Sequence, residues 1–244
     1  MPRSDLLLSS GFLAFARHCG VLQAIEASEL EIDAVVGTSS GALIGALWAA
    51  GMSASEIERE LLTTQPHQLM RPHLALWRGL FSLRALVAWL EARLPPTFDA
   101  LPRPFAVGVV GPEGQGTLLS DGPLAHAVAA SCAIPWVFTP VVIDGTSWQD
   151  GGVVDRLMVQ PWRTWRGDRP ALVHLVAPSR GPETTDDLSG LAVVRTPRSG
   201  ASFLSLGDVA GQVSEARQLA EAVLWSNAAP SSRASTPAGG TSRW

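Results

Sequence analysis

The chain has 244 residues, of which 46% are hydrophobic and 16% charged, and its formal net charge is −4. These values fit one domain with a sizeable core, and the scattered basic residues argue against a nucleic-acid partner. All 18 basic residues are arginine and tyrosine is absent, which excludes mechanisms that need a lysine Schiff base or a tyrosine acid.

The first fifty residues contain two strand–turn–helix units. Residues 5–8 form a short apolar run that ends at Ser-Ser-Gly, and residues 12–28 carry apolar side chains at helical spacing. Residues 31–40 predict a second strand, and residues 41–51 a second helix with Gly51 at its C-terminal cap. Two such units predict an α/β fold in which helices cover a parallel sheet.

The rest of the chain adds helices and strands of both kinds. Ser53 and Glu56 form a capping-box pattern that predicts a helix through about Leu62. The remaining patterns predict an amphipathic helix over 80–94, two strands around a glycine-rich turn within 104–120, a small-residue helix over 122–134, a buried strand over 171–179, a polar loop over 181–190, an edge strand over 191–195 and a helix over 208–225.

The domain prediction is a single unit over residues 1–225, followed by a Ser/Ala/Pro/Gly-rich tail over 226–244 that we expect to be disordered. Residues 1–16 are similar to a secretory leader, but Asp5 interrupts the basic end and the Ser-Ser-Gly that follows breaks the apolar run. We therefore predict a cytoplasmic location, with secretion that uses no cleavable leader as the open alternative. No stretch approaches the roughly 20 apolar residues of a spanning helix.

Neither metal nor cofactor binding is predicted. Cys19 and Cys132 stand far apart in apolar surroundings, and the histidines lack the short spacings typical of metal ligands. We interpret both cysteines as reduced core residues.

The junction of the second strand and second helix reads Gly-Thr-Ser-Ser-Gly. This Gly-x-Ser-x-Gly pattern is typical of a nucleophile elbow, in which a sharp turn exposes a serine and its neighbours at −2 and +2 must be nearly free of side chain. Gly37 and Gly41 meet that demand, and the helix dipole favours negative charge at its N-terminus. Ser39 is the candidate nucleophile, with Ser40 as the less favoured neighbour. The alternative is a tight core turn with no chemistry.

A serine hydroxyl needs a base to accept its proton. Asp150 ends a strand-like pattern and is followed by Gly151 and Gly152, which let the backbone turn away from the carboxylate, although Asp-Gly-Gly alone is more often an ordinary turn. The order Ser39, Asp150, His174 also matches a hydrolase triad. His174 lies inside a buried strand, so we interpret it as a core histidine and predict that Asp150 is the base, with a raised pKa.

Four segments in this order and spacing resemble the patatin-like phospholipases: LLLSSGFLAFARHCGVLQAI, GTSSGALIGAL, LLSDGPLAHAVAASCAIPWVFTPV and WQDGGVVD. The resemblance covers roughly residues 5–180. It implies a three-layer α/β/α fold with a mainly parallel central sheet. It also implies a catalytic dyad that hydrolyses lipid acyl esters, with Ser39 as nucleophile and Asp150 as base.

The resemblance further implies an oxyanion loop after the first strand, with three glycines, a basic residue and another glycine. This chain retains only Gly11, and Ala14 stands where the basic residue is expected. Because oxyanion donors are backbone N–H groups, Gly11, Phe12 and Leu13 can still form the hole.

Three other positions bear on the site. Arg17 either replaces the missing charge or lies on a solvated helix face. The small residues around Ser131 are expected to pack behind the elbow rather than to react. Asp155 and Arg156 stand where many relatives carry Asn-Pro, which leaves the local support of Asp150 open.

The predicted function is hydrolysis of a lipid or phospholipid acyl ester through an acyl-enzyme, with only transient contact to a membrane or micelle. Residues 66–94 are the expected source of a mobile cap, with Leu74, Leu76 and Trp77 as lid candidates. The alternative is a catalytically weak lipid- or protein-binding relative with a degenerate oxyanion loop.

Overall fold

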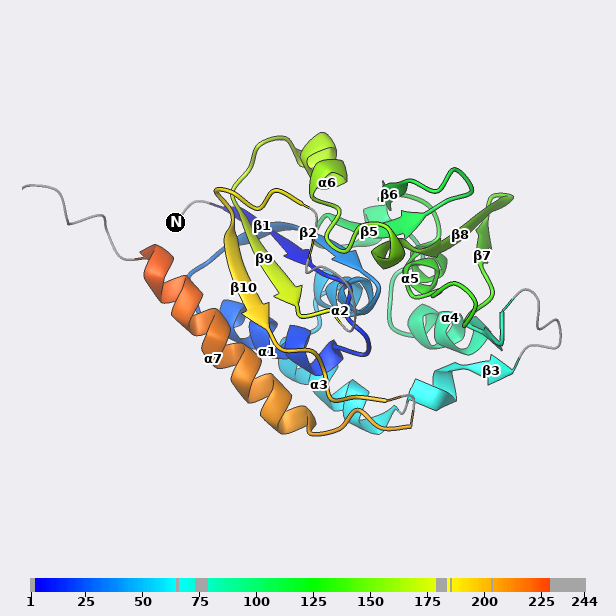
Figure 1. Ribbon diagram of the computed structural model, residues 1–244, viewed down its shortest axis with the longest axis horizontal. Coiled ribbons are helices and arrows are strands. Elements are labelled where there is room, and N and C mark those ends of the chain that lie inside the picture. Colours follow the sequence, from blue (N-terminus) through cyan, green and yellow to red (C-terminus); the bar gives the residue numbers. More distant parts are fainter. Residues whose placement is uncertain are drawn as a thin grey trace, which may run out of the picture.

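The computed structural model describes residues 3–64, 66–72, 79–178, 184, 186–202 and 204–228. An eight-stranded mixed sheet forms its centre, with strand order β10-β9-β1-β2-β5-β8-β7 and with β6 paired to β5 (Figure 1). The parallel strands are β1 (Ser4–Leu8), β2 (Ile32–Thr38), β5 (Phe105–Val110), β9 (Ala171–Val176) and β10 (Ala192–Thr196). The antiparallel strands are β6 (Gly116–Leu119), β7 (Val141–Ile143) and β8 (Thr146–Asp150).

The central strands are buried on both faces, which explains their continuous apolar sequences. Because side chains alternate along a strand, Leu6 and Leu8 enter the larger core while Leu7 enters the smaller one. The larger core also receives α1 (Phe15–Glu26), α2 (Ser40–Ala49) and α7 (Val209–Ala228), and the smaller core receives α6 (Val159–Arg166). The result is the predicted three-layer α/β/α arrangement.

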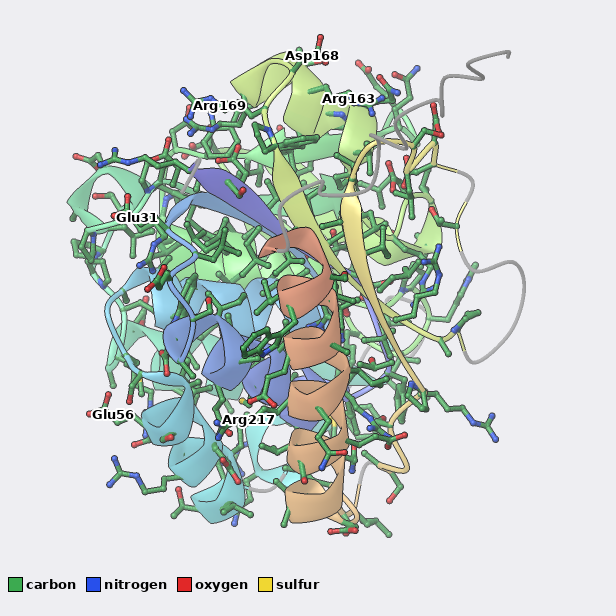
Figure 2. The ribbon with its side chains drawn as sticks, turned by 90° about the vertical axis from the view of Figure 1, so that its left-hand side faces the viewer. Glu31, Glu56, Arg163, Asp168, Arg169 and Arg217 are labelled. Atoms are coloured by element: carbon green, nitrogen blue, oxygen red, sulfur yellow. The ribbon has the colours of Figure 1, made fainter. Side chains whose placement is uncertain are left out.

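The other helices lie around the larger core: α3 (Ala54–Thr63), α4 (Arg84–Glu91) and α5 (Leu124–Ser131). Short elements complete the described chain: η1 (Pro66–Leu69), β3 (Arg71–Pro72), β4 (Phe81–Ser82), η3 (Phe98–Ala100) and η4 (Gly151–Val153). Figure 2 shows α7 running along the outside of the N-terminal helices. Gly20 permits this approach, since a Cβ there would stand 2.3 Å from the Val213 carbonyl oxygen.

Most predicted elements are confirmed, including the capping box of Ser53 and Glu56 and the place of β10 at the sheet edge. Three helices are shorter than predicted, and one of them is α5, which covers only part of the predicted range 122–134. Helix α1 begins at Phe15 because the preceding residues form a turn in which Leu13 has φ of 48°. Helix α4 begins at Arg84 because the backbone of Phe81 pairs instead with residues 137 and 139.

Some expectations fall on residues that the structure does not describe. These are the lid candidates Leu74, Leu76 and Trp77, part of the loop over 181–190, and residues 229–244 of the expected tail. Within the described ranges, no helix combines the length and apolar character needed to cross a bilayer.

Candidate active site

Ser39 lies at the junction of β2 and α2 with φ of 55° and ψ of −118°, a backbone conformation that a residue with a side chain rarely adopts. Sterics require both flanking glycines. A Cβ at Gly37 would stand 2.4 Å from the Gly41 carbonyl oxygen, and a Cβ at Gly41 would stand 2.3 Å from that of Leu8. This strained strand-to-helix turn with close-packed glycines on both sides has the backbone features expected of a nucleophile elbow.

Helix α5 holds the elbow from behind. The fully buried Ser131 accepts a hydrogen bond from the Ser39 N–H at 2.8 Å and donates one to the Gly108 carbonyl at 2.7 Å. The free thiol of Cys132 donates to the Ser39 carbonyl at 3.4 Å. Ser131 therefore positions the elbow rather than supplying a second reactive group, as the sequence suggested for this small-residue segment.

Asp150 ends β8 and is only 3% exposed. Burial raises the pKa of its carboxyl group to about 6, while hydrogen bonds from the Ser39 side chain and the Gly152 N–H lower it in part. The Gly152 N–H lies 2.8 Å from Oδ1. The Ser39 side chain thus lies close enough to lower the pKa of a carboxyl group 111 positions away in sequence.

The two glycines after Asp150 sit in close contact with neighbouring loops. A Cβ at Gly151 would stand 2.7 Å from the Gly108 carbonyl carbon, and a Cβ at Gly152 would stand 2.5 Å from the Cβ of Ser10. Side chains at either position would push the turn away from the sheet or from the loop that follows β1. Gly151 and Gly152 therefore allow the turn after Asp150 to pack closely against β5 and Ser10.

His174 lies apart from this pair, in a buried polar cluster that the sequence reading did not anticipate. Its Nδ1 is 2.8 Å from Nδ1 of His18, and its Nε2 is 2.9 Å from Oγ1 of Thr196. Nε2 of His18 is in turn 3.2 Å from Oγ of Ser40. An Nδ1–Nδ1 hydrogen bond needs one donor and one acceptor, so the ring that accepts is neutral.

Burial favours the neutral form of both rings. Desolvation lowers the pKa of His18 to about 3 and holds the pKa of His174 well below its ordinary value. The ring nitrogens of both residues are occupied by each other, Thr196 and Ser40. The contacts therefore match the interpretation of His174 as a core histidine.

A small apolar cavity adjoins Ser39. It has a volume of about 90 Å³ and is lined by Gly11, Phe12, Leu13, Phe15, Ser39, Ser40, Leu43, Leu69, Met70, Leu83, Leu86, Cys132, Ile134 and Phe138. The three predicted oxyanion residues therefore border the same cavity as the elbow serine. Its walls suit a hydrocarbon chain rather than a charged ligand.

A larger open cleft of about 780 Å³ lies elsewhere, at the beginning of β2. Charged side chains line it, and several neutralise one another, as in the 2.6 Å ion pair between Arg169 and Asp33. Figure 2 shows Arg169 and Glu31 at this end of the molecule, away from Glu56. Because none of the predicted site residues lines it, the small apolar cavity is the better candidate despite its size.

Comparison with known proteins identifies the family of the chain. Residues 6–161 match the family model of the patatin-like phospholipases. The chain belongs to this family. An uncharacterized NTE family protein of Mycobacterium tuberculosis is 31% identical over 189 residues, which are 74% of this chain and 51% of that protein, and a Mycobacterium bovis protein matches equally. The chain thus spans about half the length of these curated relatives.

Two solved structures share the fold. VipD from Legionella pneumophila superposes with a TM-score of 0.65 at 12% identity, over 93% of this chain and 67% of that one. ExoU, in its complex with SpcU from the type III secretion system of Pseudomonas aeruginosa, gives a TM-score of 0.51 at 16% identity, over 92% and 52%. At these identities the likeness concerns the fold alone.

This patatin-like chain departs from the expected pattern chiefly before α1, where Ala14 replaces a basic residue. Neither expectation for Arg17 holds. Its side chain is only 7% exposed, and it forms an ion pair with Glu215 and a 3.4 Å hydrogen bond to the Gln212 carbonyl. Arg17 therefore ties α1 to α7 and neither faces solvent nor supplies charge to the loop.

The segment after Asp150 forms a capped turn. Asp155 accepts hydrogen bonds from the N–H groups of Leu157 and Met158 at 3.0 and 2.8 Å, so it caps the turn that leads into α6. Among the described residues, no group of three or more His, Cys, Asp or Glu side chains is arranged to hold a metal ion.

Proposed function

We propose that this chain is a serine acyl-ester hydrolase that cleaves lipid or phospholipid acyl esters with a Ser39–Asp150 dyad. The proposal is carried by the proximity of Ser39 to the buried Asp150 carboxylate, whose pKa the Ser39 side chain lowers. A carboxyl group with a pKa of about 6 is largely ionised at pH 7 and is a stronger base than an ordinary aspartate. It can therefore accept the serine proton without an intervening imidazole.

The reaction follows from this arrangement. Ser39 Oγ attacks the ester carbonyl while Asp150 takes its proton, and the oxyanion is stabilised by N–H groups of Gly11, Phe12 and Leu13. As the tetrahedral intermediate collapses, the bond to the leaving alcohol breaks and Asp150 returns the proton to that alcohol. Water then attacks the acyl-enzyme and gives a proton to Asp150, and Ser39 recovers its hydrogen as the carboxylic acid leaves.

The acyl chain is proposed to occupy the apolar cavity beside Ser39. Leu43 and Phe138 are among its lining residues, which include no charged side chain. A second void of about 20 Å³ shares Phe15, Leu43 and Leu69 with it and lies deeper, against Trp89. The small volumes favour short or medium acyl chains as the first substrates to test.

The decisive experiment uses p-nitrophenyl esters of graded chain length and a fluorophosphonate probe. We expect Ser39-dependent hydrolysis and labelling, both lost in Ser39→Ala and strongly reduced in Asp150→Asn. Ser40→Ala is the matched control, because it removes the neighbouring hydroxyl and should leave Ser39 labelled. Absence of labelling in the wild type would contradict the proposal.

Two outcomes point to other assignments. If His174→Ala abolishes turnover while the circular dichroism spectrum is unchanged, a triad replaces the dyad. If the wild type binds fatty acid or lipid without hydrolysing it, the second candidate function is supported: a binding relative whose oxyanion loop has lost activity. The observation that favours this second candidate is the alanine at position 14.

We further propose that the substrate is reached at a lipid surface through the segment between α5 and β7. Trp136 is 86% exposed and has φ of 69°, between Ile134 and Phe138 of the cavity wall. Leu80 is 48% exposed, and its neighbour Phe81 is hydrogen-bonded to the backbone of Val137. An exposed indole beside an apolar cavity suits the interface of a bilayer or micelle.

This contact is tested with anionic and zwitterionic vesicles. Trp136→Ala should weaken vesicle binding and hydrolysis of vesicle-borne ester while sparing a soluble ester. Trp225→Ala is the control, because Trp225 is 78% exposed and lies near the C-terminal end of α7. Figure 1 shows that end of α7 on the opposite side of the molecule from α5 and β7. If Trp225→Ala weakens vesicle binding and hydrolysis of vesicle-borne ester as much as Trp136→Ala does, the role proposed for Trp136 is wrong.

A further inference from the structure

Arg156 connects the loop that follows Asp150 to the loop that precedes α1. Its Nη2 donates to the Ser10 carbonyl at 2.6 Å and to the Val176 carbonyl at 2.7 Å, and its Nε donates to Ser10 Oγ at 3.3 Å. The Ser10 N–H donates in return to the Arg156 carbonyl at 2.9 Å. Ser10 is thus held at three atoms by a residue 146 positions away.

The Ser10 carbonyl belongs to the same peptide unit as the Gly11 N–H. In a planar trans peptide these two groups point in opposite directions, so a hydrogen bond that fixes the carbonyl also fixes the direction of the N–H. No described residue accepts a hydrogen bond from the Gly11 N–H. Arg156 therefore determines where this backbone donor points.

The next two peptide units are held in the same manner by other donors. The Gly11 carbonyl accepts from the Ala14 N–H at 3.2 Å, and the Phe12 carbonyl accepts from the Ser199 hydroxyl. The N–H groups of Phe12 and Leu13 are thereby also fixed in direction. Of the three anchors, only that of the Ser10–Gly11 unit is a charged side chain.

A guanidinium group suits this position for two reasons. The carbonyls of Ser10 and Val176 follow and end the neighbouring strands β1 and β9, and unpaired buried carbonyls are destabilising. Arginine presents several donors in a rigid fork and can satisfy both carbonyls at once, whereas the ammonium group of lysine acts as a single mobile point.

We propose that Arg156 is a positioning residue that orients the Ser10–Gly11 peptide so that the Gly11 N–H faces the oxyanion, in place of the basic residue absent at position 14. This inference rests on the proposed hydrolase function. The chain differs from the family pattern at positions 155–156 and at position 14, and one rearrangement explains both differences. The charge that supports the loop comes from the loop that carries Asp150 rather than from the oxyanion loop itself.

The test compares Arg156→Ala and Arg156→Lys with Arg103→Ala. Arg103 is the matched control because it is also partly buried and also donates to two backbone carbonyls, those of Ile32 at 3.3 Å and Trp48 at 3.2 Å. Ile32 begins β2, whereas Ser39 follows its end. Each variant is assayed for kcat and KM on a soluble p-nitrophenyl ester and for thermal unfolding.

Since loss or misplacement of one oxyanion donor costs about 100-fold or more, we expect Arg156→Ala to lower kcat by about 10- to 100-fold with KM little changed. Arg156→Lys should show an intermediate loss, which keeps the test valid if the alanine variant folds poorly. Affinity for a trifluoromethyl ketone, whose adduct carries an oxyanion, should fall in parallel with kcat. Millimolar guanidinium should partly restore kcat of Arg156→Ala but not alter Arg103→Ala.

A kcat of Arg156→Ala equal to that of Arg103→Ala, without guanidinium rescue, would overturn the inference while leaving the hydrolase proposal intact. Absence of Ser39-dependent turnover in the wild type would overturn the hydrolase proposal and this inference together. The two failures are distinguished by the Ser39→Ala comparison.

Discussion

The elbow around Ser39 and the loop over residues 10–13 border the same cavity, but the elbow restricts its residue types much more strictly than the loop does. In the elbow, a Cβ at Gly37 or Gly41 would meet backbone atoms at 2.3–2.4 Å, so no other residue fits. In the loop, the groups proposed to act are backbone N–H groups, which every residue except proline provides. The elbow therefore keeps its pattern, while the loop has lost all but one glycine of the expected motif.

Under the proposed function, the loop needs anchored carbonyls more than it needs particular side chains. Arg156, the Ala14 N–H and Ser199 hold three successive carbonyls from three different parts of the chain. Substitutions in the two segments should consequently have effects of different size. The four predictions below run from the largest expected effect to the smallest.

Asp150→Asn removes the carboxylate that is proposed to act as the general base. We expect kcat to fall by about 1000-fold, within the range for loss of a general base. Because burial raises the folded-state pKa to about 6, the ionised carboxylate destabilises the fold above that pH. Asparagine should therefore raise the free energy of unfolding at pH 8 by up to about 3 kcal/mol, with the gain disappearing as the pH falls to about 4.

Urea unfolding at pH 8 and pH 4 measures that change. In the wild type, the same titration predicts that kcat/KM increases with pH and levels off with a midpoint near 6. A midpoint near 4, together with no stabilisation by asparagine at pH 8, would contradict the raised pKa.

Gly41→Ala tests the steric demand of the elbow. A Cβ there would lie 2.3 Å from the Leu8 carbonyl oxygen, which is backbone and cannot rotate aside. We expect at least a 100-fold loss of kcat and a loss of roughly 1–3 kcal/mol in unfolding free energy, as for other overpacked sites. Steady-state assays and thermal unfolding measure both effects, and near-wild-type activity would show that the elbow tolerates displacement.

Gly11→Ala is the corresponding change in the oxyanion loop. Its new Cβ would meet the Cβ of Ala14 at 2.9 Å and of Val176 at 3.1 Å, which are contacts with side chains rather than backbone. Because Arg156 still holds the preceding carbonyl, we expect only about a 10-fold loss of kcat, smaller than the loss from a missing oxyanion donor. A loss equal to that of Gly41→Ala would mean that this glycine is as constrained as the elbow.

Ser199→Ala removes the hydroxyl that holds the Phe12 carbonyl. The hydroxyl is exposed, and a water molecule can take its place, so we expect kcat to fall by only about two- to threefold. Measuring kcat of Ser199→Ala and Arg156→Ala in the same assay compares the two anchors directly. A larger effect for Ser199 than for Arg156 would transfer the main anchoring role to the 199 loop.

Most strands and helices and the two dyad candidates could be predicted from the sequence because local patterns encode them, but α6 and β7 were not predicted. Helix and strand periodicities and the capping box act within a few residues, and the elbow glycines are fixed by contacts with their own turn and the neighbouring strand. The placement of Asp150 beside Ser39 needed the wider resemblance, since no local pattern relates positions 111 residues apart.

Only the tertiary structure decided which partners the buried polar side chains find. Arg17 pairs with α7, His18 pairs with His174, and Arg156 holds Ser10, each across more than 140 positions of sequence. A buried charge or ring nitrogen must be satisfied, but many acceptors can satisfy it, so its residue type does not identify its partner. That choice follows from which strand ends and helix faces packing brings together.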